Sequence, residues 1–522
     1  MDESDAEDDY NVAKAAYQCL QLYAQCIGGE VVAPVLSFVE ANLRSEDWHN
    51  RDAAVAAFGA IMDGPDVKVL DPLVKQALPV LISMMDDSNI QVKDSAAFAL
   101  SRICDFCSES IDPDTHLQPL MSALFNGLMS SPKMAASCCL ALMNLTERFV
   151  GDDGASQNPL TRHFQDSVSS LLTVTEKEGA DNQLRTAAYE VLGGFVTNAA
   201  NDSLQIVASL SDVILRRLEA TIPMQKQVVS VDDKITLEEL QTSLASVLLC
   251  IIQRLEQNIA PQADRIMQVS LEVLNVTGNT SVPDTIFAVV GALTNSLEGD
   301  FLKYMEPFVP YLYNALGNQE AYGLCAMAIG LVSDIVRALG VKAQPYCDTF
   351  MNYLLNNLRV SAIFPQRGVD LLTSGKQSDK LNNQLKPSIL QTFGDIANAI
   401  GTHFETYLTV VAQVLQQAAG VSVAPDVSFD MLDYILSLRE GIMDAWGGIL
   451  LAFKETPKGM SKASRGVRNA LISDSQPAPK LCRAHLHASA NDRSGSKPKR
   501  RPAPSFNGRC RVRQFLHCSL VI

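Results

Sequence analysis

A carboxylate recurs at a fixed helical position every 42 residues in the first third of the chain. The positions are Asp52 and Asp94, Asp63 and Asp105, and Glu147 one period further on. Around Asp94, the segment 91–106 places apolar residues at helical spacing on one face and mostly polar residues on the other. Because an internal period of about 40–47 residues is typical of stacked helix pairs, this recurrence predicts an all-α superhelix with one continuous core.

Composition agrees with a helical array and reveals a division of charge. Of 522 residues, 47% are hydrophobic but only 6% are aromatic, which suits packing between small side chains on helices. Residues 456–522 hold 14 Lys and Arg against two Asp, whereas residues 1–455 hold 28 basic and 56 acidic residues. The acidic body favours basic partners and argues against nucleic acid or an anionic membrane as the ligand.

Targeting and membrane signals are not evident in the sequence. The first ten residues are acidic, so no secretory signal is expected there. The longest apolar stretches, such as 246–252, are too short for a bilayer, so we expect no membrane insertion. Cysteines within apolar helical patterns indicate free thiols in a reducing compartment.

The chain divides into three parts. Residues 1–10 form an acidic loop, residues 11–454 an array of an opening helix and about nine helix pairs, and residues 455–522 a disordered basic tail. Within the array, Asp334 and Asp395 occupy like positions on neighbouring second helices but lie 61 residues apart. We assign the excess length to a long loop at 359–383. A long helix is expected at 237–255.

Four segments resemble the importin-β family of HEAT-repeat nuclear transport receptors. They are RDAAVAAFGAIMDGP (51–65), VKDSAAFALSRICD (92–105), GDFLKYMEPFVPYL (299–312) and FGDIANAIGTHFETYL (393–408). EDDYNVAKAA (7–16) also resembles the family's acidic loop and the helix that follows it. The resemblance covers about residues 1–453 and implies a HEAT-repeat solenoid that lacks the family's N-terminal repeats and has an unrelated tail.

The resemblance implies a nuclear import receptor that moves between cytoplasm, nucleus and nuclear pore. Its concave face would bind the basic importin-β-binding segment of the importin-α adaptor, or basic cargo, and Ran-GTP would release the cargo. Phe-Gly nucleoporins are further family partners, although their main site and the first Ran contact belong to the missing repeats. Phe98 and Leu140 stand where the family leads us to expect tryptophan, which lowers the expected adaptor affinity. The alternative is a generic HEAT scaffold that binds through loops and edges.

The recurring carboxylates, here called the acidic ladder, provide the candidate binding residues. A basic peptide along the concave face would meet one carboxylate per repeat, each able to pair with Lys or Arg. Asp52 and Asp94, near helix starts, could instead bond a neighbouring repeat. Phe98 is either a stacking platform for a cation or a core residue. The candidate interface is Asp63, Phe98, Asp105, Leu140, Glu147, Glu190 and Asn198, and the acidic loop that could contact Ran or the adaptor is Asp2, Glu3, Asp5, Glu7, Asp8 and Asp9.

Catalytic and metal-binding patterns are weak. Cys104 and Cys107 have CxxC spacing but no second pair nearby, whereas structural zinc needs four ligands. No Gly-rich phosphate loop and no nucleophile–base array is apparent. We therefore expect a binding protein without catalytic activity, metal or cofactor.

Overall fold

The computed structural model describes residues 12–150, 155–176, 182–278, 280–318, 320–360, 377–420 and 429–454. All regular elements in these ranges are α-helices or short 3₁₀ helices. The described chain forms two compact units, a first unit of residues 12–216 with 246–255 and a second unit of residues 217–245 with 256–454. The predicted acidic loop (1–10) and basic tail (455–522) lie outside the described residues.

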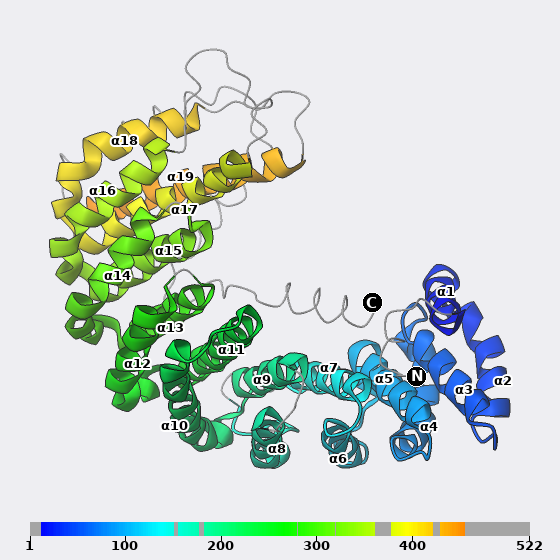
Figure 1. Cartoon of the computed structure of the whole chain (residues 1–522). Helices are drawn as coiled ribbons and strands as arrows, with labels where there is room; N and C mark the ends of the chain where they lie inside the picture. The colour runs from blue at the N-terminus through cyan, green and yellow to red at the C-terminus, as the bar shows by residue number, and fades with distance from the viewer. Residues whose placement is uncertain are drawn as a thin grey trace. The chain divides into compact units, whose positions relative to one another are not determined.

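The first unit stacks helix pairs in two layers (Figure 1). After α1 (Val12–Ile27), a first-helix layer contains α2 (Val32–Asn42), α4 (Val67–Met84), α6 (Leu117–Gly127) and α8 (Phe164–Glu176). A second-helix layer contains α3 (Trp48–Ala60), α5 (Ile90–Phe106), α7 (Pro132–Arg148) and α9 (Asn182–Thr197). Each pair packs together, and α3, α5, α7 and α9 pack in succession. Two longer helices, α10 (Leu204–Thr221) and α11 (Val231–Leu255), each have residues in both units.

Side-chain caps determine where the helices of the second-helix layer begin. Asp47, Asn89 and Ser131 precede α3, α5 and α7 and are themselves 42 residues apart. Each accepts a hydrogen bond from a backbone N–H of the first turn, at 3.0, 2.8 and 3.1 Å respectively. Such caps satisfy amides that would otherwise lack a partner. The repeat period is therefore also a period of helix starts.

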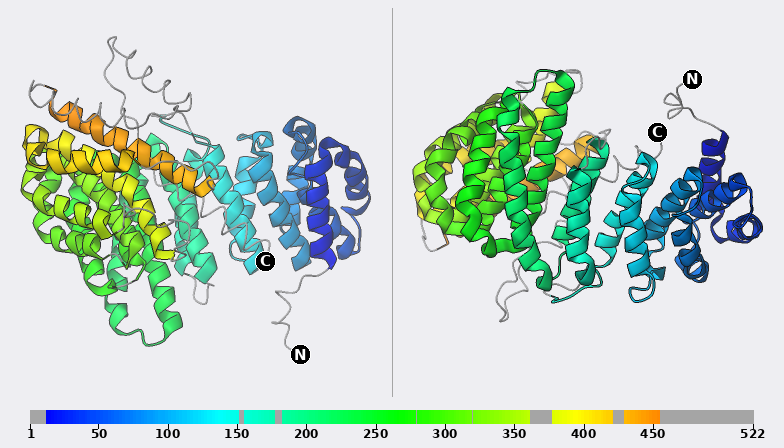
Figure 2. Two further views of the ribbon diagram at one scale, coloured as in Figure 1. Left: turned by 90° about the horizontal axis from the view of Figure 1, so that it is seen from above. Right: turned by 60° about the horizontal axis from the view of Figure 1, so that its bottom comes forward.

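The second unit repeats the plan, and its last two second helices have 24 residues each. Its pairs are α12 (Ala263–Thr277) with α13 (Val282–Leu297), α14 (Met305–Gly317) with α15 (Tyr322–Leu339), α16 (Gln344–Val360) with α17 (Gln377–Ile400), and α18 (Glu405–Ala419) with α19 (Phe429–Ala452). Helices α13, α15, α17 and α19 pack in succession. Figure 2 shows from two further directions that helices within a unit run side by side. Fully buried phenylalanines, among them Phe308, Phe350 and Phe393, fill the core.

Glycines bring α17 and α19 unusually close together. A Cβ added at Gly448 would lie 2.1 Å from the carbonyl oxygen of Gly394, and one added at Gly441 would lie 2.6 Å from that of Pro387. Real Cβ atoms do not tolerate such distances from backbone, so only glycine permits this approach. A Cβ added at the neighbouring Gly447 would have no atom within 4 Å. Glycine is therefore required only where α19 touches α17, and not along the whole helix.

The structure confirms the predicted all-α repeat class and corrects two boundaries. Helix α17 begins at Gln377, so the predicted loop at 359–383 is too long, and its remaining part, 361–376, lies outside the described residues. The polar run 377–384 lacks an apolar stripe, yet it contains no Gly or Pro that would stop a helix extending N-terminally from Leu385. Helix α11 begins at Val231 and not at Leu237, because the Ser230 hydroxyl oxygen accepts from the Asp233 amide at 3.0 Å.

The prediction that no segment is long enough to span a bilayer is wrong. Some helical stretches are long and apolar enough to do so when judged by length and composition alone. Within the described residues, three stretches meet such a criterion: Val12–Asn42, Val231–Thr277 and Tyr322–Leu358. Each contains consecutive helices joined by a 3₁₀ turn, so its hydropathy builds up over more residues than any unbroken apolar run. In the last of them, 50% of the most apolar window is buried inside the protein.

Candidate basic-peptide interface

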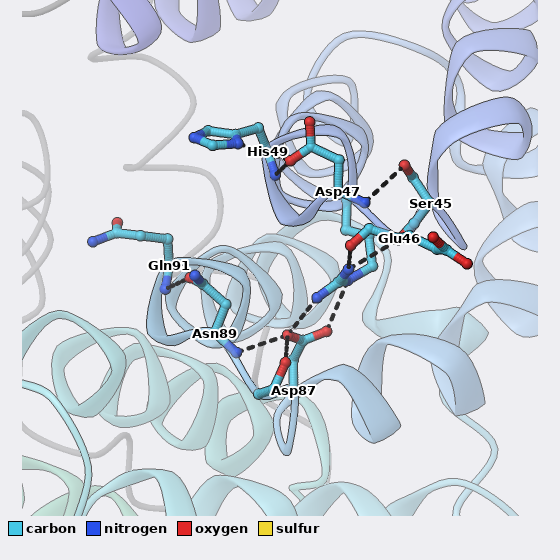
Figure 3. Close-up of polar contacts among 9 residues, drawn as sticks. Ser45, Glu46, Asp47, His49, Asp87, Asn89 and Gln91 are labelled. Atoms are coloured by element: carbon cyan, nitrogen blue, oxygen red, sulfur yellow. Dashed lines mark hydrogen bonds and ion pairs between the residues drawn. The ribbon is translucent and has the colours of Figure 1, made fainter.

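An ion pair between repeats fixes the turns that begin the second helices. The Arg51 guanidinium donates to both carboxylate oxygens of Asp87, at 3.0 and 2.9 Å, and to the backbone oxygens of Ser45 and Glu46, at 2.9 and 3.1 Å. Figure 3 shows this network beside the caps of α3 and α5. The Arg51 hydrogen bonds hold the pKa of Asp87 below its ordinary value. Arg51 therefore joins the turn before α3 to the turn before α5.

Asp52 and Asp94 also make contacts between repeats. The Ser95 hydroxyl donates to Asp52 at 2.6 Å, and the Ser131 hydroxyl donates to Asp94. Burial raises the pKa of both carboxyl groups, only partly offset by these hydrogen bonds. The intramolecular interpretation of Asp52 and Asp94 is thus confirmed.

Asp63 already has a cation within the protein. It lies in the turn after α3 and accepts from Gln25 at 2.8 Å and from Arg102 at 3.3 Å. The Arg102 side chain is 5% exposed and Asp63 is 24% exposed. The same guanidinium lies 4.2 Å above the centre of the Phe106 ring. A basic ligand would therefore compete with Arg102 for Asp63.

Phe98 packs against α1 and keeps part of its ring exposed. Its ring meets the Tyr17 ring edge-on, with centroids 5.2 Å apart and an interplanar angle of 82°. Burial raises the pKa of Tyr17 to about 12, and its hydroxyl has no hydrogen-bond partner among the described residues. Both predicted roles, core contact and stacking platform, remain compatible with a half-buried ring.

The remaining candidates lie along or directly after α5, α7 and α9. Asp105 and Glu147 are the penultimate residues of α5 and α7, and Asp105 is half-buried whereas Glu147 is exposed. Leu140 is half-buried on α7. Glu190 is half-buried within α9, and its burial raises the pKa of its carboxyl group. Asn198, just past α9, accepts a hydrogen bond at its backbone oxygen from Asn158 at 3.0 Å. The structure places these side chains on successive helices of one layer, and the acidic loop lies outside the described residues.

A second series of carboxylates, in the second unit, was not predicted from the sequence. Its members are Asp284, Asp334, Asp395 and Asp444, one on each of α13, α15, α17 and α19. Burial raises the pKa of every one. Arg337 donates to Asp334 at 2.6 Å, whereas one carboxylate oxygen of Asp395 is buried without a hydrogen-bond partner in the described part of the chain. The like positions of Asp334 and Asp395 on neighbouring second helices are the signal in the sequence that could have predicted this series.

A metal site and a reactive thiol are two chemical roles to be considered for the acidic, histidine and cysteine side chains of the described residues. No group of three or more His, Cys, Asp or Glu side chains there could hold a metal ion. Cys104 and Cys107 are both buried, and burial raises the pKa of the Cys107 thiol to about 11. A buried thiol in its neutral form is a poor metal ligand and nucleophile.

Stacked helix pairs with capped second helices and bonds between repeats define a HEAT-like helical-repeat protein. The HEAT-like repeat family model matches residues 48–103. The model described as importin subunit beta-1-like, TPR repeats, matches residues 119–369 and 363–464. The chain therefore belongs to the importin subunit beta-1-like family.

Relatives and solved structures agree with this assignment. The chain is 43% identical over 455 residues to importin subunit beta-1 of Schizosaccharomyces pombe, an alignment that covers 87% of this chain and 51% of the relative. A crystal structure of importin beta has 58% identity and a TM-score of 0.82, covering 95% of this chain and 54% of the other. A Kap95:Nup1 complex gives 30% identity and a TM-score of 0.76, covering 91% and 53%. A structure of Kap95p with Ran-GDP has 31% identity and a TM-score of 0.71, and the match covers 90% of this chain and 52% of the other. The chain thus spans about half the length of the relatives it matches.

Proposed function

We propose that this chain is the part of a nuclear import receptor that binds basic peptide segments. Membership of the importin subunit beta-1-like family carries the proposal. The charge of residues 1–455, with twice as many acidic as basic residues, supports it. The expected ligands are the basic segment of an importin-α adaptor and basic cargo, and the expected role is that of a receptor and not an enzyme.

Ran and nucleoporins complete the proposed set of partners. Solved relatives are described in complex with Ran-GDP and with Nup1. By analogy we propose that Ran-GTP displaces the basic ligand from this chain and that the protein moves between cytoplasm, nucleus and nuclear pore. The residues of this chain that would contact Ran remain the predicted acidic loop at 1–10.

The second-helix layer of the first unit offers a graded set of acidic contacts. Asp105 and Glu147 lie at the C-terminal ends of α5 and α7, where a carboxylate gains nothing from the helix dipole and a cation is favoured. A peptide cation placed there would therefore pair with both the side chain and the helix terminus. Asp63 would contribute less, because Arg102 already neutralises part of its charge.

Charge reversal at these two positions tests the proposal. We expect Asp105→Lys with Glu147→Lys to weaken binding of a fluorescent polybasic adaptor peptide by at least about tenfold. Glu147 is exposed, so its substitution should change melting temperature little, whereas Asp105 is half-buried, so the melting temperature of Asp105→Lys alone is measured as well. The control is Glu40→Lys with Glu109→Lys, which makes the same charge change at exposed positions of α2 and of the 3₁₀ turn Ser108–Ser110. Titrations at low and moderate salt separate long-range attraction from contact.

The control pair defines the outcome that overturns the assignment. If both double variants lose affinity equally, the acidic character of the whole chain and not this face attracts the peptide. If neither loses affinity, the protein binds through loops and edges, as the generic scaffold would.

A further inference from the structure

Two side chains of the protein bind the same oxygen of Asp63. The Gln25 amide on α1 donates to Asp63 Oδ2 at 2.8 Å, and the Arg102 guanidinium on α5 donates to the same oxygen at 3.3 Å. A carboxylate oxygen has two lone pairs, so these two donors fill the hydrogen-bonding capacity of Oδ2. Asp63 Oδ1 accepts from no described residue and is not among the buried polar atoms that lack a partner. One of the two carboxylate oxygens is therefore open to a ligand.

Arg102 is held in place by burial and by an aromatic ring. Its side chain is 5% exposed, and its guanidinium lies 4.2 Å above the centre of the Phe106 ring. Its Nε is buried without a hydrogen-bond partner in the described part of the chain, and Asp63 is the carboxylate that compensates its charge. Taking the counterion from a buried cation is costly, and an ion pair formed at the surface would offset little of that cost. We therefore expect Arg102 to keep Oδ2 while a ligand is bound.

Glu147, at the end of α7, presents its carboxylate differently. Its side chain is exposed, and no side chain of the described residues donates to it. Both carboxylate oxygens are thus open, and such a group can bind an arginine through two parallel hydrogen bonds. Lysine has a compact ammonium group that acts as a point charge and cannot form this two-oxygen pairing. The number of open oxygens therefore decides whether a position distinguishes arginine from lysine.

We propose that Gln25 and Arg102 determine the ligand preference at Asp63. By binding Oδ2 they make Asp63 a single-oxygen position that accepts lysine and arginine alike, whereas Glu147 favours arginine. This assignment rests on the proposed basic-peptide function and adds which cation each position of the interface selects. Arg102 also lowers the contribution of Asp63, because its positive charge repels a ligand cation. A bound basic segment is thus expected to tolerate either cation beside α3 and to favour arginine beside α7.

Opening Oδ2 should convert Asp63 into a position that selects arginine. The variant is Gln25→Leu with Arg102→Met, in which methionine keeps an unbranched apolar side chain against Phe106 and removes the charge. Fluorescein-labelled, capped peptides of eight arginines or eight lysines are titrated with the full chain at moderate salt. Relative to the parent, we expect octa-arginine to bind at least about fivefold more tightly and octa-lysine about twofold, so the ratio of the two dissociation constants changes.

Further variants assign this change to Asp63. Adding Asp63→Asn to the double variant should abolish the gain, whereas Asp63→Asn in the parent should weaken both peptides equally. Glu147→Gln in the parent should weaken octa-arginine more than octa-lysine. The matched control is Gln76→Leu with Lys68→Met, which makes the same charge change at exposed positions of α4 and so measures the effect of net charge alone.

Gln25→Leu alone provides a second route, because Arg102 is buried and its replacement could lower stability. Gln25 is exposed, so its substitution should leave the melting temperature almost unchanged. It opens one of the two lone pairs of Oδ2 and should shift the arginine-to-lysine ratio in the same direction by a smaller factor, about twofold. Melting temperature is measured for every variant, and the titrations are made well below it.

Two results would overturn this assignment while the proposed function stands. The first is an arginine-to-lysine ratio equal to that of the parent in Gln25→Leu and in the folded double variant. The second is a gain that survives Asp63→Asn or that the control variant reproduces, since the charge of the whole chain would then explain it. Binding of neither peptide by the parent would instead refute the proposed function, and this assignment with it.

Discussion

Helices α3, α5 and α7 of the first unit and the pair α17 and α19 of the second unit are held together by different means. In the first unit, polar side chains link one repeat to the next, through Arg51 with Asp87, Ser95 with Asp52, and Ser131 with Asp94. In the second unit, α17 and α19 approach through glycines until backbone meets backbone. The comparison shows that one repeat plan can be fixed in register either by directional hydrogen bonds or by steric contact.

The two means should respond differently to substitution. Removing one polar side chain breaks only the hydrogen bonds that it makes, and each typically contributes about 0.5–1.5 kcal/mol to stability. A backbone contact has no flexible atoms that can move aside, so one methyl group must displace a whole helix. The contact of α17 with α19 is therefore expected to be the more sensitive to small changes in volume, and the links among α3, α5 and α7 to changes in hydrogen bonding.

The largest effect is expected from Gly448→Ala. The new methyl group would lie 2.1 Å from the Gly394 oxygen, so α19 must shift, at a cost of about 2–3 kcal/mol. Gly447→Ala is the matched control, since its methyl group meets nothing and replaces a glycine by a better helix former. Melting temperature and hydrogen exchange in α17 and α19 would measure both. Equal stability of the two variants would show that the contact is not tight in solution.

A smaller effect is expected from Ser131→Ala in the first unit. The substitution removes the cap of α7 and the hydroxyl donor to Asp94, so we expect a loss of about 1–2 kcal/mol. Ser130→Ala, at the exposed neighbouring position, should change stability little, and Ser131→Thr should retain most of it. Chemical denaturation of the four proteins would give the free energies. A harmless Ser131→Ala would mean that the polar links do not determine the register of the first unit.

The smallest effect is expected from Asp395→Asn, and it depends on pH. Burial raises the pKa of Asp395 in the folded chain, so the folded state holds its proton more tightly than the unfolded state does. Its contribution is therefore fully present below the ordinary carboxyl pKa of about 4 and is lost as pH rises through the raised value. At neutral pH, Asp395→Asn should be more stable than the parent by about 1 kcal/mol, because the amide avoids burying a charge.

Melting curves between about pH 4 and pH 7 would test the sign of this effect. The parent should lose stability across that range more steeply than Asp395→Asn. The exposed Asp433→Asn should follow the parent. Parallel curves for parent and Asp395→Asn would contradict the inferred burial of the carboxylate.

The sequence alone determined the repeat class, the approximate number of helix pairs and the family. These depend on periodic apolar spacing and on short local motifs, which are properties of neighbouring residues along the chain. It also separated the acidic body from the basic segment after residue 455, because charge can be counted without coordinates.

Only the tertiary structure decided which carboxylates of the ladder are available to a ligand. Asp52 and Asp94 meet serines 43 and 37 residues away, and Asp63 meets Arg102 39 residues away. The same period that suggested a ligand-binding ladder also serves helix caps and links between repeats. Pairing of this kind depends on the distance between side chains of adjacent repeats and on their burial, and neither is encoded in the spacing of acidic residues along the chain.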